Sequence, residues 1–257
     1  MHIEEVALSD RERFRYGDLS FWERIEKTLE GLTDVYEAAN LIMSMGSIKY
    51  VRRVFGGIVR DIFKSKGSFI LDAGCGPGTS ISILLESTEK STCIVGLDPI
   101  EAMLLKSKEN FGGEDRVELV RGVFETLPFR EGSIIGAVYS FSFRDAIDYI
   151  KSALELRRIL KVGGTAVILD LGKPRSRRIL AKVLEGPYMT FLPALAGAVL
   201  LGWEGVKRYL ELRRTYLRFP ETPKLYILFF KLFGKVKSLY ALGGAVFILI
   251  ADKLNSS

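Results

Sequence analysis

From residue 68 onward, short apolar runs alternate with stretches in which apolar residues recur every three or four positions. An apolar run bounded by turn residues is typical of a strand buried on both faces, and the second pattern predicts a helix. The alternation therefore predicts a mostly parallel sheet with helices on both faces. The expected strands are residues 68–73, 92–97, 116–121, 133–139 and 165–170, followed by an antiparallel pair at residues 235–241 and 245–251.

Helical spacing fills the segments between these strands and also precedes the first strand. We expect an α/β fold with a doubly wound, mostly parallel seven-stranded sheet of the Rossmann-like type and an antiparallel last strand. Residues 1–65 are expected to form an N-terminal helical cap, and residues 66–257 the main domain. The expected helices lie around residues 21–25, 36–45, 50–63, 79–86, 101–110, 146–160 and 223–233.

Residues 186–202 contain no charged side chain and approach the length of a membrane span. However, Pro187 and Pro193 interrupt the run, and a span at this point would split the sheet. We therefore expect a helical, apolar lid inserted at about residues 174–222, which covers a substrate. Contact of this lid with a membrane is left open.

The first expected strand runs into a glycine-rich turn, Asp72-Ala73-Gly74-Cys75-Gly76-Pro77-Gly78. Glycines let a ligand lie directly against the main chain, and the amide groups of the following helix point at that ligand. The second strand leads to Asp98, where a carboxylate can accept hydrogen bonds from two ribose hydroxyls. Together these features predict a site for a nucleoside.

The glycine spacing argues against a dinucleotide. That fingerprint requires a further glycine three residues after the second one, and the two candidate positions hold Thr79 and Ile81. His2 is the only histidine, which excludes a Ser-His-Asp triad and argues against zinc, so we expect no metal. Two cysteines are too few for a disulfide scaffold and fit a reducing cytoplasm.

The charge and hydropathy of the chain bear on its partners. The net charge is +6, the isoelectric point is about 9.2 and the mean hydropathy is +0.17. Without an RNA-binding motif, this combination favours an anionic membrane surface over nucleic acid. Alternatively, the excess positive charge only keeps the protein surface soluble and binds no partner. We expect a cytoplasmic protein that binds no nucleic acid, and leave open both contact with the inner face of the membrane and a homodimer.

The glycine turn resembles the first motif of class I S-adenosylmethionine-dependent methyltransferases, and Gly96-Leu97-Asp98 resembles their second motif. Residues 36–46 are similar to a tyrosine-acid-x-x-asparagine-x-x-methionine-serine-x-glycine signature of the quinone-ring C-methyltransferases of ubiquinone and menaquinone biosynthesis, the UbiE family. The resemblance extends from about Tyr36 to Lys253. It implies that S-adenosylmethionine methylates a ring carbon of a polyprenyl quinol precursor and leaves S-adenosylhomocysteine.

The resemblance also implies a donor site. The glycines would admit the methionine part of the donor, Asp72 would favour its cationic groups and Asp98 would hold the ribose. Residues 121–129 resemble the adenine-reading motif, but Val123 replaces the usual acidic or amide residue, so adenine recognition shifts to backbone groups. The expected donor-binding residues are Asp72, Gly74, Cys75, Gly76, Gly78, Asp98, Pro99, Met103, Gly122, Val123, Phe124 and Ser140.

Residues 140–145 resemble the family's serine-phenylalanine-glycine-leucine-arginine-asparagine segment, with Ser142 for glycine and Asp145 for asparagine. Methylating a ring carbon requires electron density, which deprotonation of a neighbouring phenol supplies. The expected catalytic residues are Arg144, which stabilises the phenolate; Asp145, which accepts the proton itself or through a water; and Tyr36, which aligns the ring or relays that proton. From spacing alone, Tyr36 is better explained by packing, and a surface ion pair explains Arg144 and Asp145 equally well.

Three other functions stay open at this stage. The first is methylation of another lipophilic small molecule. The second is a non-catalytic nucleoside-binding protein of the same fold, and the third, disfavoured by Thr79, is an NAD-dependent enzyme.

Overall fold

The computed structural model describes residues 19–64, 67–173 and 179–255. Its centre is a seven-stranded sheet with strand order β3-β2-β1-β4-β5-β7-β6. Strands β1 to β5 are parallel, and β7 is antiparallel to both of its neighbours, which confirms the predicted fold class. The strands are β1 (Phe69–Ala73), β2 (Cys93–Asp98), β3 (Val117–Arg121), β4 (Ile134–Ser140), β5 (Leu160–Leu171), β6 (Gly234–Ala241) and β7 (Val246–Lys253).

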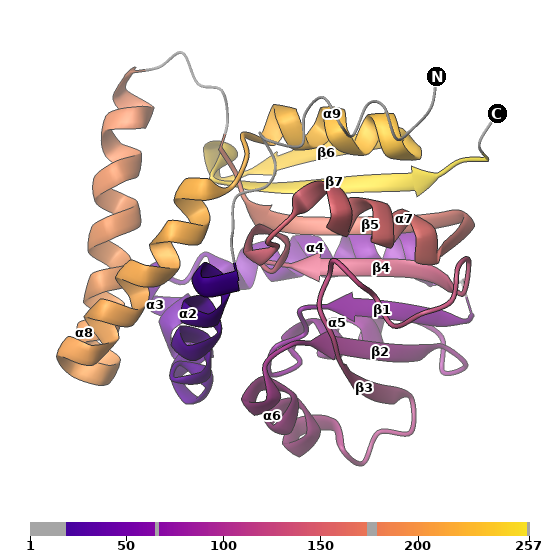
Figure 1. Cartoon of the computed structure of the whole chain (residues 1–257), viewed down its shortest axis with the longest axis horizontal. Helices are drawn as coiled ribbons and strands as arrows, with labels where there is room; N and C mark the ends of the chain where they lie inside the picture. The colour runs from indigo at the N-terminus through magenta and orange to yellow at the C-terminus, as the bar shows by residue number, and fades with distance from the viewer. Residues whose placement is uncertain (1–18, 65–66, 174–178, 256–257) are drawn as a thin grey trace.

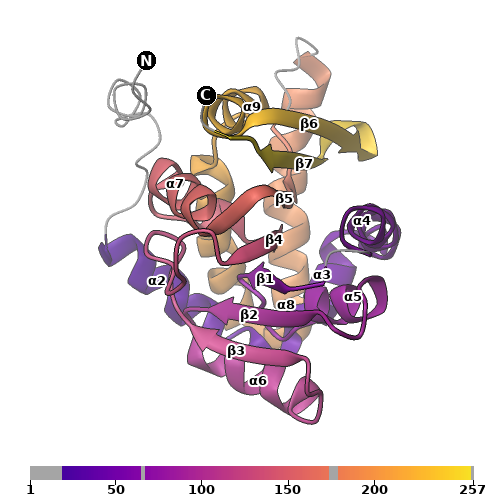
Figure 2. The same ribbon diagram turned by 90° about the vertical axis from the view of Figure 1, so that its right-hand side faces the viewer.

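Helices cover both faces of the sheet (Figure 2). On one face lie α4 (Ile48–Phe63) and α5 (Thr79–Ser87), and on the other lie α7 (Tyr149–Ile159) and α9 (Thr222–Phe233). Helix α6 (Glu101–Phe111) borders β2 and β3. Each face has its own apolar core because side chains alternate along a strand: Ile70 packs toward α4 and α5, and Leu71 packs toward α7 and α9.

The boundaries of two elements differ from the prediction for physical reasons. Helix α7 begins at Tyr149, not at residue 146, because the Asp148 side chain caps it by accepting a hydrogen bond of 2.9 Å from the backbone N–H of Lys151. Strand β5 begins five residues before its expected start, since Leu160 already pairs with Ile134 of β4.

Three helices stand over the carboxyl ends of the parallel strands (Figure 1). They are α2 (Leu19–Glu30), α3 (Tyr36–Met43) and α8 (Ile179–Arg218). Helix α8 consists of two limbs that fold back on each other at Gly202, whose φ is 62°. The predicted lid is therefore a helical hairpin. The expected division into an N-terminal cap and a main domain stays a prediction, and the first 18 residues of that cap lie outside the described residues.

Ion pairs and aromatic contacts join α2 to the second limb of α8. The guanidinium of Arg218 lies 3.7 Å from the ring centroid of Phe21, and Arg24 pairs with Glu211 at 3.4 Å. Across the described parts of the chain, we find no helix that is long and apolar enough to cross a membrane.

The hairpin of α8 depends on two glycines at its crossing. A Cβ on Gly197 would collide with the backbone of Gly205 on the other limb. We expect Gly197→Ala to lower the free energy of unfolding by about 1–3 kcal/mol because the limbs must move apart. The matched control is Gly57→Ala on α4, where nothing lies within 4 Å of the new Cβ and the better helix former raises stability by up to about 1 kcal/mol. Urea unfolding measures both variants; equal effects would contradict this account of the hairpin.

Candidate active site

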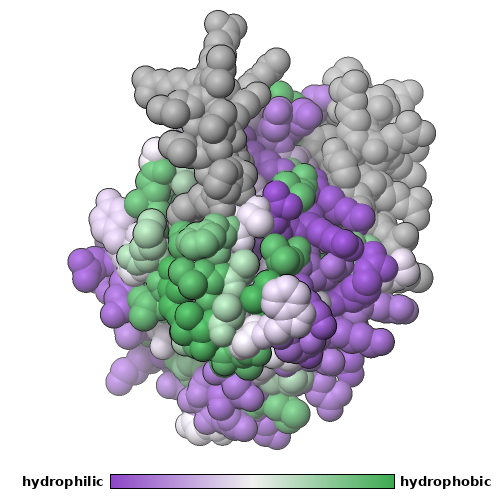
Figure 3. Space-filling model, turned by 90° about the vertical axis from the view of Figure 1, so that its left-hand side faces the viewer, coloured by the Kyte–Doolittle hydropathy of each residue, from purple (hydrophilic) through white to green (hydrophobic). Residues whose placement is uncertain are grey.

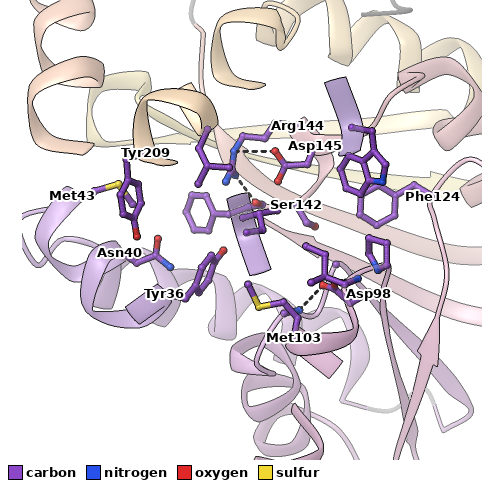
Figure 4. A pocket seen from close by; sticks show the side chains of 18 residues that line it. Tyr36, Asn40, Met43, Asp98, Met103, Phe124, Ser142, Arg144, Asp145 and Tyr209 are labelled. Carbon is purple, nitrogen blue, oxygen red and sulfur yellow. Dashed lines mark hydrogen bonds and ion pairs between the residues drawn. The ribbon is translucent and has the colours of Figure 1, made fainter. Parts of the chain in front are cut away.

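A cavity lies at the carboxyl edge of the sheet, beneath α2, α3 and the second limb of α8 (Figure 4). It brings together all three expected catalytic residues, Tyr36, Arg144 and Asp145. The expected donor-binding residues that line it are Gly74, Gly76, Asp98, Pro99, Met103 and Phe124. Segments that are distant in the sequence therefore meet in one cavity.

The glycine turn forms the floor of this cavity at the end of β1. Gly74 and Gly76 have φ angles of 71° and 53°, which L-residues with a side chain rarely adopt. The N–H of Gly74 donates a 2.7 Å hydrogen bond to the Leu97 carbonyl, so the turn is fixed to β2. Nothing lies within 4 Å of a Cβ built on Gly76, so the backbone there is open to a ligand.

Asp98 ends β2 beside this turn. One carboxylate oxygen accepts a 2.9 Å hydrogen bond from the N–H of Gly76, and the other accepts one of 2.9 Å from the N–H of Ile100. Burial raises the pKa of Asp98 to about 6, although the two backbone hydrogen bonds oppose this shift. The side chain thus joins the glycine turn to Ile100, the residue before α6, and also faces the cavity.

Asp72 is fully buried near the end of β1, below the turn, and neither carboxylate oxygen has a hydrogen-bond partner. Burial and the nearby charge of Asp98 raise the pKa of Asp72 well above its usual value. An orphaned carboxylate under a glycine turn fits a cationic donor, whose positive charge would relieve this penalty. Gly76, Asp98 and Asp72 therefore suit S-adenosylmethionine.

Six expected donor-binding residues do not line the main cavity: Asp72, Cys75, Gly78, Gly122, Val123 and Ser140. The Cys75 side chain belongs to the apolar core between the sheet and α4 and α5, and Gly78 starts α5. Gly122 follows β3 and packs on Leu97, and Ser140 ends β4. Val123 is 37% exposed and lines a smaller adjoining cavity.

Glu125 has a structural role. Its carboxylate accepts hydrogen bonds from the backbone N–H groups of Ile147 and Asp148, at 2.8 and 3.1 Å, and from the Ser152 hydroxyl at 3.2 Å. These bonds hold the segment between the 3₁₀ turn at Phe143–Asp145 and α7.

Arg144 is held by Asp170 at the end of β5. The guanidinium donates to Asp170 at 3.0 Å, the backbone N–H of Arg144 donates to the other carboxylate oxygen at 3.0 Å, and the guanidinium also donates to the Phe141 carbonyl. Asp170 is completely buried, whereas the side chains of Arg144 and Asp145 are 18% and 14% exposed. Arg144 and Asp145 are thus a cavity pair and not a surface ion pair.

Asp145 is the best-placed proton acceptor in the cavity. Its Oδ1 is buried without a hydrogen-bond partner and lies 3.8 Å from Nε of Arg144. Burial raises the pKa of Asp145 to about 6, Arg144 lowers it in part, and Asp170 adds to the rise. A carboxylate that lines a cavity and has a pKa near neutrality is typical of a general base.

Two tyrosines face this pair from the helical side of the cavity (Figure 4). Tyr36 comes from α3, and burial raises its pKa, while the charge of Arg144 opposes the rise. Tyr209 comes from α8; it is 3% exposed, its hydroxyl has no hydrogen-bond partner, and burial raises its pKa. An unpartnered buried hydroxyl beside the cavity suits a ligand oxygen.

A cluster around Glu37 fixes α3 relative to the donor turn. Both carboxylate oxygens of Glu37 accept from Arg52 of α4, at 2.6 and 3.1 Å. The hydroxyl of Thr79, the first residue of α5, donates to the same carboxylate at 2.7 Å. The helix that carries Tyr36 is thereby attached to the helix that follows the glycines.

Sequence reasoning did not assign a site role to several other residues that line the cavity: Trp22, Asn40, Met43, Phe141, Tyr209 and Leu212. Asn40 and Met43 belong to the signature at residues 36–46, and this membership could have identified them as site residues. Trp22 and Leu212 sit on amphipathic helices whose apolar positions equally fit a core, so spacing alone could not identify them.

The sheet with its antiparallel β7, the glycine turn and Asp98 define an S-adenosylmethionine-dependent methyltransferase. The sequence profile of the ubiE/COQ5 methyltransferase family matches residues 20–252, and the chain belongs to this family.

The names of similar proteins are consistent with this family. The chain is 28% identical to the ubiquinone/menaquinone biosynthesis C-methyltransferase UbiE of Geobacter sulfurreducens, over 82% of this chain and 80% of that protein. It is 27% identical to the demethylmenaquinone methyltransferase of Staphylococcus epidermidis, over 91% of this chain and 95% of that protein. A crystal structure of a SAM-dependent methyltransferase from Aquifex aeolicus has the same fold, with a TM-score of 0.54 and 14% identity over 77% of this chain and 88% of that one.

The buried Asp72 carboxylate predicts a pH-dependent stability of the protein without donor. The folded state holds this proton more tightly than the unfolded chain, which loses it above about pH 4. Stability therefore falls as the pH rises from there toward the raised pKa. We expect Asp72→Asn to be more stable than the parent by about 1–3 kcal/mol at about pH 8, and the difference to shrink at about pH 5. Thermal unfolding followed by circular dichroism measures this; a difference independent of pH would contradict it.

Proposed function

We propose that the protein transfers a methyl group from S-adenosylmethionine to a ring carbon of a polyprenyl quinol precursor in quinone biosynthesis, without a metal. One observation carries the proposal: the buried pair of Arg144 and Asp145 faces the same cavity as Asp98 and the glycine turn. Family membership and the two quinone methyltransferases to which the chain is similar support the acceptor class.

On the donor side, the residues mainly hold and orient. When bound, S-adenosylmethionine supplies an electrophilic methyl group from its sulfonium. Gly76 leaves room for the donor against the main chain, and Asp98 accepts hydrogen bonds from the ribose hydroxyls through its remaining lone pairs. Met103 and Phe124, which are 3% and 6% exposed, give the adenine apolar contacts. Because methyl transfer is an in-line displacement, this positioning is the largest contribution of the protein.

On the acceptor side, the residues handle a proton and a developing charge. The carboxylate of Asp145 accepts the proton of a ring hydroxyl, and the guanidinium of Arg144 stabilises the resulting phenolate. The phenolate shares its negative charge with the ring carbon, which then attacks the methyl group. As the new carbon–carbon bond forms, the carbon–sulfur bond breaks and the ring oxygen becomes a carbonyl. The hydrogen on that ring carbon then leaves to solvent as a proton, and the phenolate that re-forms takes back the proton held by Asp145.

The helical wall of the cavity binds the rest of the acceptor. Tyr36 and Tyr209 offer hydroxyls to the ring oxygens, and Met43 and Leu212 offer apolar surface to the start of an isoprenoid tail. Each methylene of the tail that leaves water contributes about 0.8 kcal/mol to binding. A cytoplasmic location, peripheral contact with a membrane and a homodimer remain further expectations from the sequence.

The direct test is a methyl-transfer assay with the full chain, labelled S-adenosylmethionine and reduced demethylmenaquinone as the acceptor. We expect label on a ring carbon, identified by mass spectrometry of the product. Asp98→Ala is the control, since it removes the carboxylate that holds the ribose and should abolish donor binding in calorimetry. Donor binding without any labelled quinol would contradict the proposed acceptor, and full donor affinity in Asp98→Ala would remove Asp98 from the site.

The role of Asp145 predicts a pH profile. Only the carboxylate form accepts a proton, so kcat at saturating donor should fall at acid pH, and the fall should lie below about pH 6 because the bound cation lowers the pKa of Asp145 from that value. Asp145→Asn should lower kcat about 100-fold and remove this acid limb. Saturating donor keeps the titration of Asp98 out of the measurement.

The control for Asp145→Asn is Arg144→Lys, which retains a cation beside Asp170 while it removes the planar guanidinium. This variant should lose turnover but keep donor affinity within a few fold. Because the family pattern has asparagine where this chain has Asp145, a near-normal kcat in Asp145→Asn would assign proton transfer to a water that residue 145 orients.

A further inference from the structure

The first limb of α8 has an apolar outer face. Phe191, Leu195 and Val199 are 65%, 41% and 66% exposed and lie four residues apart, so they form one stripe along the helix. At the turn, the stripe is followed by Leu201 and by Trp203, which is 73% exposed. Figure 3 shows a continuous apolar patch on the side of the molecule that α8 covers. A contiguous exposed patch of this kind marks a surface that meets a partner or a membrane.

The basic excess of the chain lies in a longer segment that includes both limbs of α8. Residues 173–218 contain ten Lys and Arg against three Asp and Glu, a net charge of +7, whereas the complete chain has +6. The other residues together are therefore close to neutral, with a net charge of −1. Along the sequence, basic residues lie on both sides of the uncharged run 186–203. Apolar residues flanked by Lys and Arg are typical of helices that lie on an anionic bilayer.

The inner face of this limb is already occupied by protein. Ala196 is completely buried, and Gly197 packs against Gly205 of the second limb. Leu200 packs against the cluster of Leu32, Ala39 and Tyr209, and Tyr209 lines the cavity. The exposed stripe and the acceptor side of the cavity are thus opposite faces of one helical hairpin.

We propose that the outer face of the first limb of α8, from Phe191 to Trp203, docks on the surface of an anionic lipid bilayer. The apolar stripe enters the region between headgroups and acyl chains, and the positive charge of residues 173–218, which lie on both sides of the stripe in the sequence, attracts lipid phosphates. Delivery of a lipophilic acceptor from the bilayer to the cavity rests on the proposed function, but the docking itself does not.

The charge distribution favours a bilayer over a second copy of the chain. A two-fold dimer through this face would bring the same patch of both copies together. Two segments with a net charge of +7 each would then repel one another. A surface of anionic lipids removes this repulsion and screens the basic residues.

The test measures binding of the full chain to vesicles without donor or acceptor, so that its result is independent of catalysis. The vesicles are phosphatidylcholine alone, or phosphatidylcholine mixed with phosphatidylglycerol. We expect flotation with the anionic vesicles and at least about tenfold weaker binding to the neutral ones. In the Trp22→Phe variant, Trp203 is the only remaining tryptophan, and its emission should shift to shorter wavelength when anionic vesicles are added.

The decisive variant is Phe191→Gln with Val199→Gln, which should weaken binding to anionic vesicles about tenfold or more. Its matched control is Phe230→Gln with Val162→Gln, which changes the same residue types at positions 50% and 56% exposed on α9 and β5, and should bind like the parent. Circular dichroism confirms that both variants fold.

Two results with vesicles would overturn the proposal: no binding of the parent to anionic vesicles, or an equal loss of binding in both double variants. A third would be a parent protein that is a dimer, a Phe191→Gln/Val199→Gln variant that is a monomer, and no vesicle binding by either protein. The last result would assign the face to a second copy. Failure of quinol methylation in the assay above, with vesicle binding intact, would contradict the proposed function alone.

Discussion

The acceptor side of the site depends on the need to neutralise Asp170, a carboxylate without solvent exposure at the end of β5. A buried charge is tolerated only when it is paired and hydrogen-bonded. Arg144 satisfies both carboxylate oxygens, one through its guanidinium and one through its backbone N–H. This pairing fixes the 3₁₀ turn from Phe143 to Asp145, and with it the direction of Asp145. It also fixes Phe141, which has a φ of 59° although it is not a glycine, since its carbonyl accepts from the same guanidinium.

A second constraint couples the acceptor wall to the donor turn. Glu37 follows Tyr36 directly and is bound by Arg52 and by Thr79, which begins α5 after the last glycine of the turn. The position of Tyr36 therefore depends on the same segment that shapes the donor cradle. Helix α8 adds Tyr209 from the other direction, where it packs with Ala39 of α3. The cavity thus needs the N-terminal helices and the hairpin of α8 as much as it needs the sheet.

The sequence predicted those site residues that directly follow a strand in the chain. The glycines and Asp98 follow strands directly, so their chemistry can be read beside a strand that is predictable from its apolar run. Arg144 and Asp145 were found as a segment, but their burial depends on Asp170, 25 residues beyond Asp145, which no spacing rule connects to them. Tyr209 and Trp22 lie on amphipathic helices, and whether such residues face a core or a cavity is decided by how the helices pack. Glu125 lies in the segment that resembles the adenine-reading motif, but its hydrogen bonds to the backbone N–H groups of Ile147 and Asp148 give it a structural role.

The side chains around the site carry mostly negative charge, whereas the net charge of the whole chain is positive. Three buried carboxylates, Asp72, Asp98 and Asp170, and the partly buried Asp145 surround the turn and the cavity, and Arg144 is the one cation among the described residues that line the cavity. Burial raises the pKa values of all four carboxyl groups, and neighbouring carboxylates add to the rise for Asp72, Asp98 and Asp145. A donor with a sulfonium and an ammonium group replaces the missing positive charge, so donor binding should lower these pKa values and return Asp145 to the form that accepts a proton. The negative cavity is thus complete only with a cationic donor, whereas residues 173–218 hold the excess positive charge of the chain.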